Sequence, residues 1–221
     1  MPEGFVWNFG ETGYLIKLNY MKIVIVGATG TIGKHVVKAL EEKGEHTLVR
    51  VGSKSGDVQV NIGDPGSIKA MFEKIGAFDA LVCTAGEGHF GPFAKLTDTE
   101  FRITIDSKLM GQVNLVLVGQ HYINSKGSFT LTSGTLGDDP VLYGASVSSV
   151  NAALDGFVRG AAIELENGVR INSVAPGVVE DSPGYFPFFP GHIPVSMHKV
   201  AQAYVKSVLG FATGKTYRVV E

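Results

Sequence analysis

The sequence predicts an α/β fold: a single domain in which helices cover both faces of a doubly wound parallel sheet. Three observations carry this prediction. Short apolar segments recur along the chain, helical patterns of apolar residues separate them, and 221 residues with 44% hydrophobic content can bury one substantial core. Strands that alternate with helices are typical of parallel sheets.

The expected elements follow in chain order. Apolar or β-branched runs predict strands at 23–26, 46–51, 58–62, 78–83, 128–133, 169–175 and 215–220. Helical spacing of apolar residues predicts helices at 32–40, 66–75, 97–122, from the region after 140 to about 166, and 197–209. We expect the single domain to span residues 21–221.

Residues 1–20 precede the first strand and carry several aromatic side chains. They lack a basic segment followed by an apolar stretch and a small-residue cleavage site, so they do not resemble a signal peptide. We expect an N-terminal extension outside the fold, either upstream of a start at Met21 or as a disordered arm.

Three glycines follow the first strand at G-x-x-G-x-x-G spacing, and a helical pattern begins directly after them. The first glycine allows a tight turn, the second a close approach of phosphate to backbone, and the third close packing of the helix. The sequence therefore predicts a dinucleotide-binding loop whose helix points its N-terminal amides at the pyrophosphate. Its residues are Gly27, Thr29, Gly30, Thr31, Ile32 and Gly33.

The exit of the second strand should meet the adenosine ribose. Arg50, Ser53 and Lys54 stand there, and no acidic residue comes before Asp57. An acid at this place favours NAD, whereas cations favour the 2′-phosphate of NADP. We therefore expect NADP, with NAD as a possibility and ordinary solvated charges as the alternative. Asp64 either caps the next helix or accepts from the adenine amino group.

Composition limits the other function classes. A net charge of −2 and a single cysteine, Cys83, favour neither a nucleic-acid partner nor a disulfide. No apolar run of about 18 residues suggests a membrane span. We expect a cytoplasmic protein with a small-molecule substrate, no metal, and Cys83 as buried packing.

From Met21 onward the chain resembles the short-chain dehydrogenase/reductase family. The resemblance rests on the glycine motif, Thr84-Ala85-Gly86 in place of Asn-Ala-Gly, Ser133, the stretch 152–157, and the stretch 170–177, which ends in Pro176-Gly177. It implies a Rossmann fold, a nicotinamide cofactor contacted at 84–86 and at 176–177, and a homodimer or homotetramer built from two long helices.

Family enzymes use a serine, a Tyr-x-x-x-Lys pair and an asparagine, and this chain lacks the complete pair. Tyrosine is only about 0.1% phenolate at pH 7, so the lysine is needed to activate it. If Tyr143 is the family tyrosine, Val147 stands in the lysine place. If 152–157 is aligned instead, Asn151 replaces lysine and Val147 replaces tyrosine. The second register keeps the longer match, and we prefer it.

Lys108 stands where the family has its asparagine. We therefore expect an exchange, with Lys108 and Asn151 facing each other beside Ser133. A surface lysine and a hydrogen-bonded core asparagine are the alternative. The candidate catalytic residues are Ser133, Lys108, Tyr143 and Asn151, and His89 is an additional loop donor.

Two functions remain open from the sequence. The first is an NADP-dependent oxidoreductase acting on a small carbonyl or alcohol. The second is a dinucleotide-binding sensor or interaction protein without turnover. The segment 179–194, rich in Pro, Gly and Phe, forms either an apolar wall or lid over the substrate, a loop packed on the core, or an oligomer contact.

Overall fold

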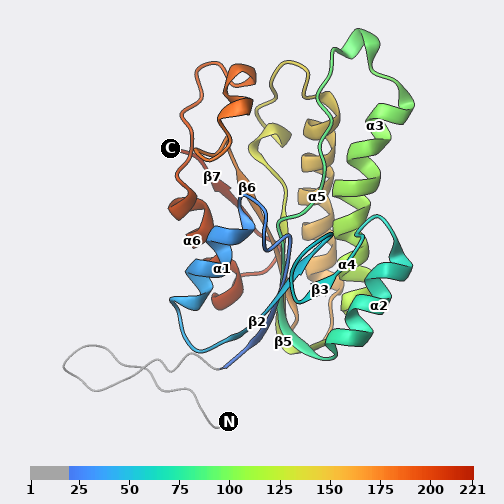
Figure 1. Ribbon diagram of the computed structural model, residues 1–221, viewed down its shortest axis with the longest axis vertical. Helices are drawn as coiled ribbons and strands as arrows, with labels where there is room; N and C mark the ends of the chain where they lie inside the picture. The colour runs from blue at the N-terminus through green and yellow to red at the C-terminus, as the bar shows by residue number, and fades with distance from the viewer. Residues whose placement is uncertain (1–19) are drawn as a thin grey trace, which may run out of the picture.

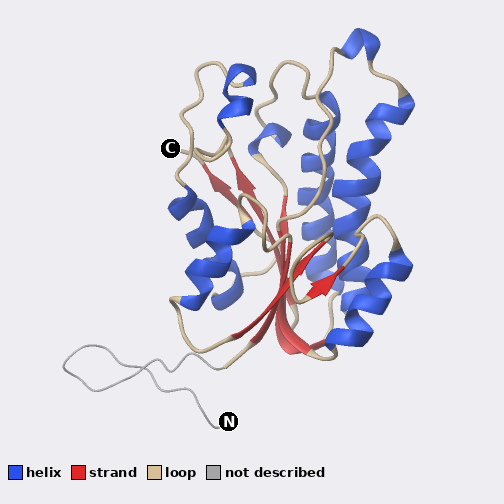
Figure 2. Ribbon diagram, viewed as in Figure 1, coloured by secondary structure: helices blue, strands red, loops and turns tan. Residues whose placement is uncertain are grey.

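A computed structural model of the protein describes residues 20–221 as three layers, a central sheet with helices on both faces (Figures 1 and 2). The expected N-terminal extension, residues 1–20, lies outside the described residues except for Tyr20. At the start of the described chain, the Tyr20 hydroxyl forms a hydrogen bond with Thr47 Oγ1 at the beginning of the second strand.

The sheet has seven parallel strands in the order β3-β2-β1-β4-β5-β6-β7, so the predicted doubly wound α/β fold is confirmed. The strands are β1 (Lys22–Val26), β2 (Thr47–Gly52), β3 (Val58–Gln59), β4 (Phe78–Cys83), β5 (Ile123–Thr132), β6 (Arg170–Pro176) and β7 (Thr216–Val219).

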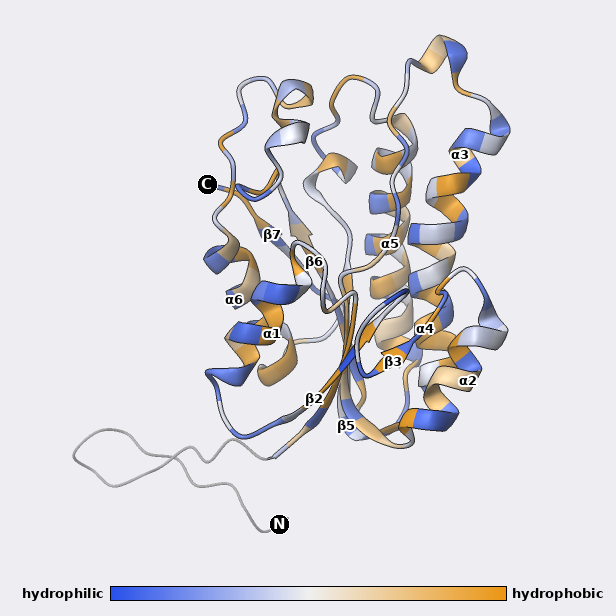
Figure 3. Cartoon of the chain, in the orientation of Figure 1, coloured by the Kyte–Doolittle hydropathy of each residue, from blue (hydrophilic) through white to orange (hydrophobic). Residues whose placement is uncertain are grey.

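Both faces of the sheet are buried, because successive side chains of a strand point to opposite sides. In β1, Val24 and Val26 join the core under α2 (Pro65–Ile75), α4 (Gly111–Gly119) and α5 (Ala145–Glu164). Ile23 and Ile25 join the core under α1 (Gly33–Glu41) and α6 (Met197–Leu209). Figure 3 shows both hydrophobic and hydrophilic stretches in the strands, and hydrophilic patches on the outer sides of the helices.

Two strands differ from their predicted bounds. β3 is two residues long instead of 58–62, because the Asn61 amide donates to Ser67 Oγ and leaves the sheet edge. β5 begins at Ile123, five residues before the predicted start, and its pairing with β4 shifts register between Phe78 and Ala80. The prediction missed this start because the stretch 124–127 is polar and glycine-containing.

The helix predicted over 97–122 is only partly α-helical. A capping box of Thr97 and Glu100 begins α3 (Asp98–Thr104), and α4 ends at Gly119. Between them Ile105–Met110 is a π-helical turn, which the apolar periodicity did not predict. Such turns are rare and occur often at functional sites.

The chain reverses its direction across the sheet between β1 and β4, which are neighbours. In open α/β sheets, ligands bind beyond the carboxyl ends of the strands at this reversal. The loops after β4, β5 and β6 all rise from that edge, at the top of Figure 1. Within residues 20–221, no helix has the length and apolar character required to cross a bilayer.

Candidate functional site

The glycine loop after β1 has the predicted backbone geometry. Gly27 adopts φ +85°, in the region where side chains are strained. A Cβ on Gly33 would lie 2.0 Å from the Gly27 carbonyl oxygen, so α1 packs against the turn only because residue 33 has no side chain. A Cβ on Gly30 would lie 3.2 Å from the same oxygen, which is also a close contact. Thr31 and Ile32 then lead into α1.

The end of β4 is fastened to this loop. The Thr84 amide donates to the Val26 carbonyl at 2.8 Å, and its hydroxyl donates to the Gly27 carbonyl at 3.1 Å. Gly86 adopts φ +140°, and a Cβ there would lie 2.9 Å from Cα of Lys108. The small residues Thr84, Ala85 and Gly86 thus bring the two loops and the π-helical turn together.

The adenosine side departs from the prediction at one residue. Arg50, expected to be available for a 2′-phosphate, forms an ion pair with Glu41 of α1. Ser53 and Lys54 are exposed in the adjoining loop. The Thr29 and Ser55 hydroxyls lie 3.1 Å apart, and sequence reasoning missed Ser55 because a single loop serine carries no pattern.

Of the two alternatives for Asp64, the structure shows the cap. Its carboxylate accepts from the Gly66 amide at 2.8 Å and begins α2. Pro65 at the first helical position is typical of such a start.

The predicted contact between Lys108 and Asn151 is present. Lys108 Nζ donates to Asn151 Oδ1 at 2.6 Å and to the Ser133 carbonyl oxygen at 2.9 Å. The Ser133 side chain is 2% exposed, and its Oγ is buried with no hydrogen-bond partner among the described residues. A buried hydroxyl without a partner costs free energy, which makes it a group prepared for a ligand oxygen.

Burial lowers the pKa of Lys108 from its usual value to about 8, although the negative charge of Asp155 opposes this change. A lysine titrating near this value can both donate and accept a proton close to neutral pH. Cys83 lies behind it, and burial raises the pKa of its thiol to about 12. Cys83 is therefore buried packing, as expected, and not a nucleophile.

Gln112 positions this centre and was missed by sequence reasoning. Its side chain is fully buried, and it donates to the carbonyl oxygens of Lys108 and Thr132 at 3.1 and 2.9 Å. Its Oε1 accepts from the Thr132 amide at 2.7 Å. The sequence did contain a signal for it, because Gln112 is a polar residue four positions after Lys108 in a mostly apolar helix.

Tyr143 does not join the other candidate catalytic residues. It adopts φ +68°, is 39% exposed, and lies on the loop before α5. The pocket around Lys108, Ser133 and Asn151 is lined instead by Val147, in agreement with the second register. The His89 backbone is held by Thr104 and Ser146, and its ring does not line the pocket either.

This pocket has a volume of about 270 Å³ and joins predicted residues from the loops after β1, β4, β5 and β6, from the π-helical turn and from α5. Its lining includes Ile32, Thr84, Ala85, Gly86, Lys108, Ser133, Val147, Asn151, Pro176, Gly177, Tyr185 and Phe189. Residues 84–86 and 176–177 therefore line one pocket together with Lys108 and Ser133. Among the described residues, its lining has one lysine and no carboxylate.

The aromatic segment after β6 forms one wall of the site. Tyr185 and Phe189 line the pocket, and the Phe90 ring packs against Tyr185 with centroids 5.7 Å apart. Asp181 ties this segment to α1 through Lys34 and His35, both at 2.9 Å. The segment therefore fits two of the three alternatives for 179–194: it lines the pocket, and it packs on a small core cluster that includes Val147 and Phe189, with Phe90 against it.

The sequence matches the family described as "Enoyl-(Acyl carrier protein) reductase" over residues 22–185. Curated relatives include the peroxisomal 2,4-dienoyl-CoA reductase SPS19 of Saccharomyces cerevisiae, 28% identical over 53% of this chain and 41% of that protein. The Arabidopsis thaliana peroxisomal 2,4-dienoyl-CoA reductase is 26% identical over 77% of this chain. The matched segments span about half the length of these two relatives, 41% and 60%.

Solved structures show the same architecture along most of the chain. Protein lin1944 from Listeria innocua is 46% identical with a TM-score of 0.88, covering 90% of this chain and 99% of its own. A small-chain dehydrogenase in complex with NADPH is 27% identical with a TM-score of 0.80, covering 91% and 97%. The protein belongs to the short-chain dehydrogenase/reductase family.

Proposed function

We propose that this protein is an NADP(H)-dependent oxidoreductase that interconverts a small carbonyl and its alcohol, with Lys108 in the acid–base role. The observation that carries the proposal is the ammonium of Lys108 held at 2.6 Å by Asn151 in one pocket with the unpartnered hydroxyl of Ser133. A sensor without turnover is supported less, because such a protein has no need for either group.

The residues present fit a nicotinamide dinucleotide. The turn at Gly27, Gly30 and Gly33 would hold the pyrophosphate, because its tight backbone leaves no room for side chains and leads into the N-terminus of α1, where backbone amides bind phosphate. Residues 84–86 and 176–177, which line the same pocket as Lys108, would hold the nicotinamide end. When bound, the dinucleotide supplies or accepts the hydride.

Ser133 and Lys108 supply the polar groups for this chemistry. Ser133 Oγ would donate a hydrogen bond to the substrate oxygen and so stabilise negative charge that develops there. The Lys108 ammonium would donate the proton in reduction and, once neutral, accept it in oxidation. Asn151 Oδ1 holds the ammonium in place. The wall of Phe90, Tyr185 and Phe189 excludes water from the pocket.

Preference for NADP over NAD rests on the loop after β2. Lys54 and the hydroxyls of Ser53, Ser55 and Thr29 would contact the 2′-phosphate. Arg50 would leave its ion pair with Glu41 and bind the 2′-phosphate instead. The relative solved with NADPH supports the same choice.

We expect NADPH to bind at least several-fold more tightly than NADH, measured by calorimetric titration. Arg50→Ala and Lys54→Ala should weaken NADPH binding and leave NADH binding nearly unchanged, since only NADPH carries the 2′-phosphate. Lys43→Ala is the matched control, because Lys43 is exposed at the opposite edge of the sheet, after α1. Equal affinities for the two dinucleotides would contradict the proposal.

The substrate is sought by following NADPH oxidation with a panel of small aldehydes, ketones and enones. The apolar wall leads us to expect turnover with compact apolar or aromatic carbonyls rather than with charged ones. Binding of NADPH with no turnover of any class would favour the sensor.

The proposal includes a homodimer or homotetramer built on α4 and α5. Large apolar side chains are exposed along these helices, namely Met110, Leu117 and Ile163. The outer face of α5 also carries exposed small residues, including Gly156 and Gly160, which permit close helix packing. A cytoplasmic location stays a prediction.

A further inference from the structure

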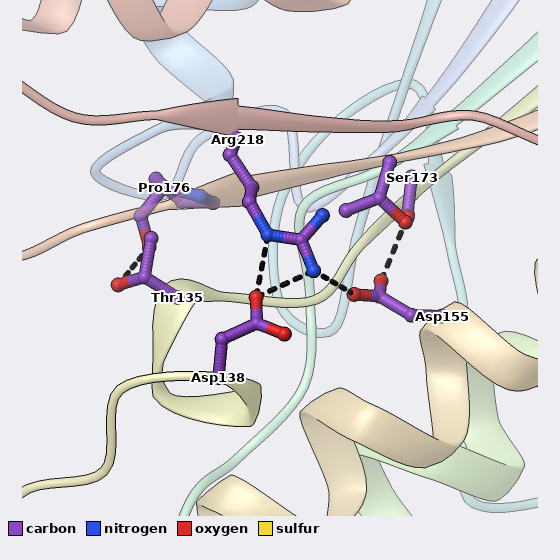
Figure 4. Close-up of polar contacts among 7 residues, drawn as sticks. Thr135, Asp138, Asp155, Ser173, Pro176 and Arg218 are labelled. Carbon is purple, nitrogen blue, oxygen red and sulfur yellow. Dashed lines mark hydrogen bonds and ion pairs between the residues drawn. The ribbon is translucent and has the colours of Figure 1, made fainter.

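Asp155 lies in a polar cluster behind the pocket, where α5, β6 and β7 meet. Its Oδ1 accepts from Ser173 Oγ at 2.9 Å, and its Oδ2 lies 3.8 Å from a guanidinium nitrogen of Arg218 (Figure 4). The same guanidinium binds the carboxylate of Asp138, on the turn after β5. Arg218 therefore lies between two carboxylates, one buried and one exposed.

The Asp155 carboxylate is costly to place in the interior. Its side chain is 7% exposed, whereas that of Asp138 is 53% exposed. Within residues 20–221, Asp155 is the only carboxylate in the buried class. A buried charge requires compensation, and Arg218 at 3.8 Å, itself bound to Asp138, compensates it only in part. The remaining negative charge acts strongly on its surroundings, because little water screens it.

The group that receives this charge lies one helical turn away. Asn151 and Asp155 are four residues apart on the same buried face of α5. Asn151 Oδ1 accepts from Lys108 Nζ at 2.6 Å, so Asp155 lies one helical turn beyond the residue that holds the ammonium.

We propose that Asp155 is a positioning residue for Lys108: its negative charge, partly cancelled by the positive charge of Arg218, keeps the ammonium charged inside the pocket. The inference rests on the proposed acid–base role of Lys108 and deepens it. Arg218 is the opposing element, because a guanidinium beside Asp155 cancels part of the carboxylate's charge. The charge state at the reaction centre is thus set by a residue one turn further along the buried face of α5.

The other groups around Lys108 do not replace Asp155. Cys83 on β4 is a neutral thiol, since burial raises its pKa to about 12. Tyr204 on α6 is neutral too, because burial raises the pKa of its hydroxyl, which binds Thr132. Tyr185 lines the pocket from the aromatic wall, and Asp106 lies on the π-helical turn itself. Asp155 is the carboxylate that raises the pKa of Lys108 against the effect of burial.

The test is an NMR titration of Lys108 in the protein without dinucleotide. The signal is assigned by its absence in Lys108→Met. Asp155→Asn keeps an oxygen that accepts from Ser173 and removes only the charge. We expect it to lower the pKa of Lys108 by about half a unit or more, less than the one to three units expected for opposite charges in direct contact.

Two further variants separate charge from damage to the fold. Arg218→Gln removes the opposing charge, so the pKa of Lys108 should rise, opposite in sign to the effect of Asp155→Asn. Asp138→Asn removes the exposed carboxylate that binds the same guanidinium. Water screens that carboxylate, so this variant should change the pKa of Lys108 clearly less than Asp155→Asn does. If Asp155→Asn does not fold, the upward shift in Arg218→Gln carries the test.

A Lys108 pKa unchanged by both Asp155→Asn and Arg218→Gln, or shifted equally by Asp138→Asn and Asp155→Asn, would overturn the inference. The titration needs neither dinucleotide nor turnover. Shifts of the expected signs in a protein that does not bind NADPH would therefore refute the proposed function and leave this inference standing.

Discussion

The proposed acid–base chemistry depends on one side chain, Lys108, which lies at a position where the family has a different residue. Lys108 lies on the π-helical turn, at the position that corresponds to the asparagine of the family. Its ammonium contacts Asn151 on α5, at the position that corresponds to the family's lysine. The exchange keeps an ammonium in the pocket while Val147 takes the place of the tyrosine. In the proposed mechanism Lys108 therefore transfers the proton itself, in place of the family's tyrosine.

Lys108→Met should therefore lower the rate of carbonyl reduction by roughly 10²–10⁴-fold, the usual contribution of a general acid. It should also weaken NADPH binding by more than the roughly 0.5 kcal/mol typical of a surface substitution. Tyr143→Phe is the control, because Tyr143 lies outside the pocket. A larger loss in Tyr143→Phe than in Lys108→Met would return the tyrosine to the mechanism.

The pH dependence has a defined sign. The Lys108 pKa is lowered by burial to about 8, so the ammonium needed for reduction is present below that pH and is lost above it. Reduction should slow as the pH rises through about 8, and alcohol oxidation should quicken over the same range. Lys108→Arg should remove this transition, since arginine stays protonated. Steady-state rates in both directions check the prediction.

At the scale of elements, the site is built by helices and loops that approach more closely than side chains would allow. α1 lies against the turn after β1, and the π-helical turn lies against the loop after β4. Gly33 and Gly86 are the points of contact. The Gln112 side chain then joins the π-helical turn to the end of β5 through hydrogen bonds to the backbone of Lys108 and Thr132.

Gly33→Ala should lower the free energy of unfolding by about 2 kcal/mol or more, because its Cβ would lie 2.0 Å from a backbone oxygen and α1 would have to move. Gly184→Ala, in the segment Pro183–Phe188, is the control, with nothing within 4 Å of the new methyl group. It should change stability by no more than about 0.5 kcal/mol, the usual range for an exposed substitution. Urea unfolding measures both, and similar effects would refute the close approach.

At the scale of the whole molecule, one side of the three-layer structure carries the exposed apolar residues of α4 and α5. Leu117 is 48% exposed and Ile163 86% exposed, so burying them in a helix-to-helix interface would remove apolar surface from water. The opposite side, with α1 and α6, keeps its apolar residues in the core.

We expect a dimer or tetramer by light scattering coupled to size-exclusion chromatography. Joint substitution Leu117→Lys and Ile163→Glu should shift the protein towards smaller species, because two charges would enter the interface. Phe211→Glu is the control: Phe211 is equally apolar and 76% exposed, but it follows α6. A monomeric wild type, or dissociation caused by Phe211→Glu alone, would contradict the assembly on α4 and α5.

The sequence by itself determined the features that depend on neighbouring residues or on one repeated spacing. The alternation of strands and helices predicted the parallel sheet, and the spacing of Gly27, Gly30 and Gly33 predicted the tight loop. The substitutions at 108 and 151 even predicted a contact between distant helices, because each fell on a matched family position.

Only the tertiary structure decided the features that arise where distant segments meet. It pairs Arg50 with Glu41, excludes Tyr143 from the pocket, and, within residues 20–221, gives Ser133 Oγ no hydrogen-bond partner. It also sets Arg218 of the last strand against Asp155 of α5. Each outcome depends on which side chains and backbone atoms compete for the same space. The local pattern of a sequence fixes conformation within an element, whereas the packing of elements selects the partner of each polar group.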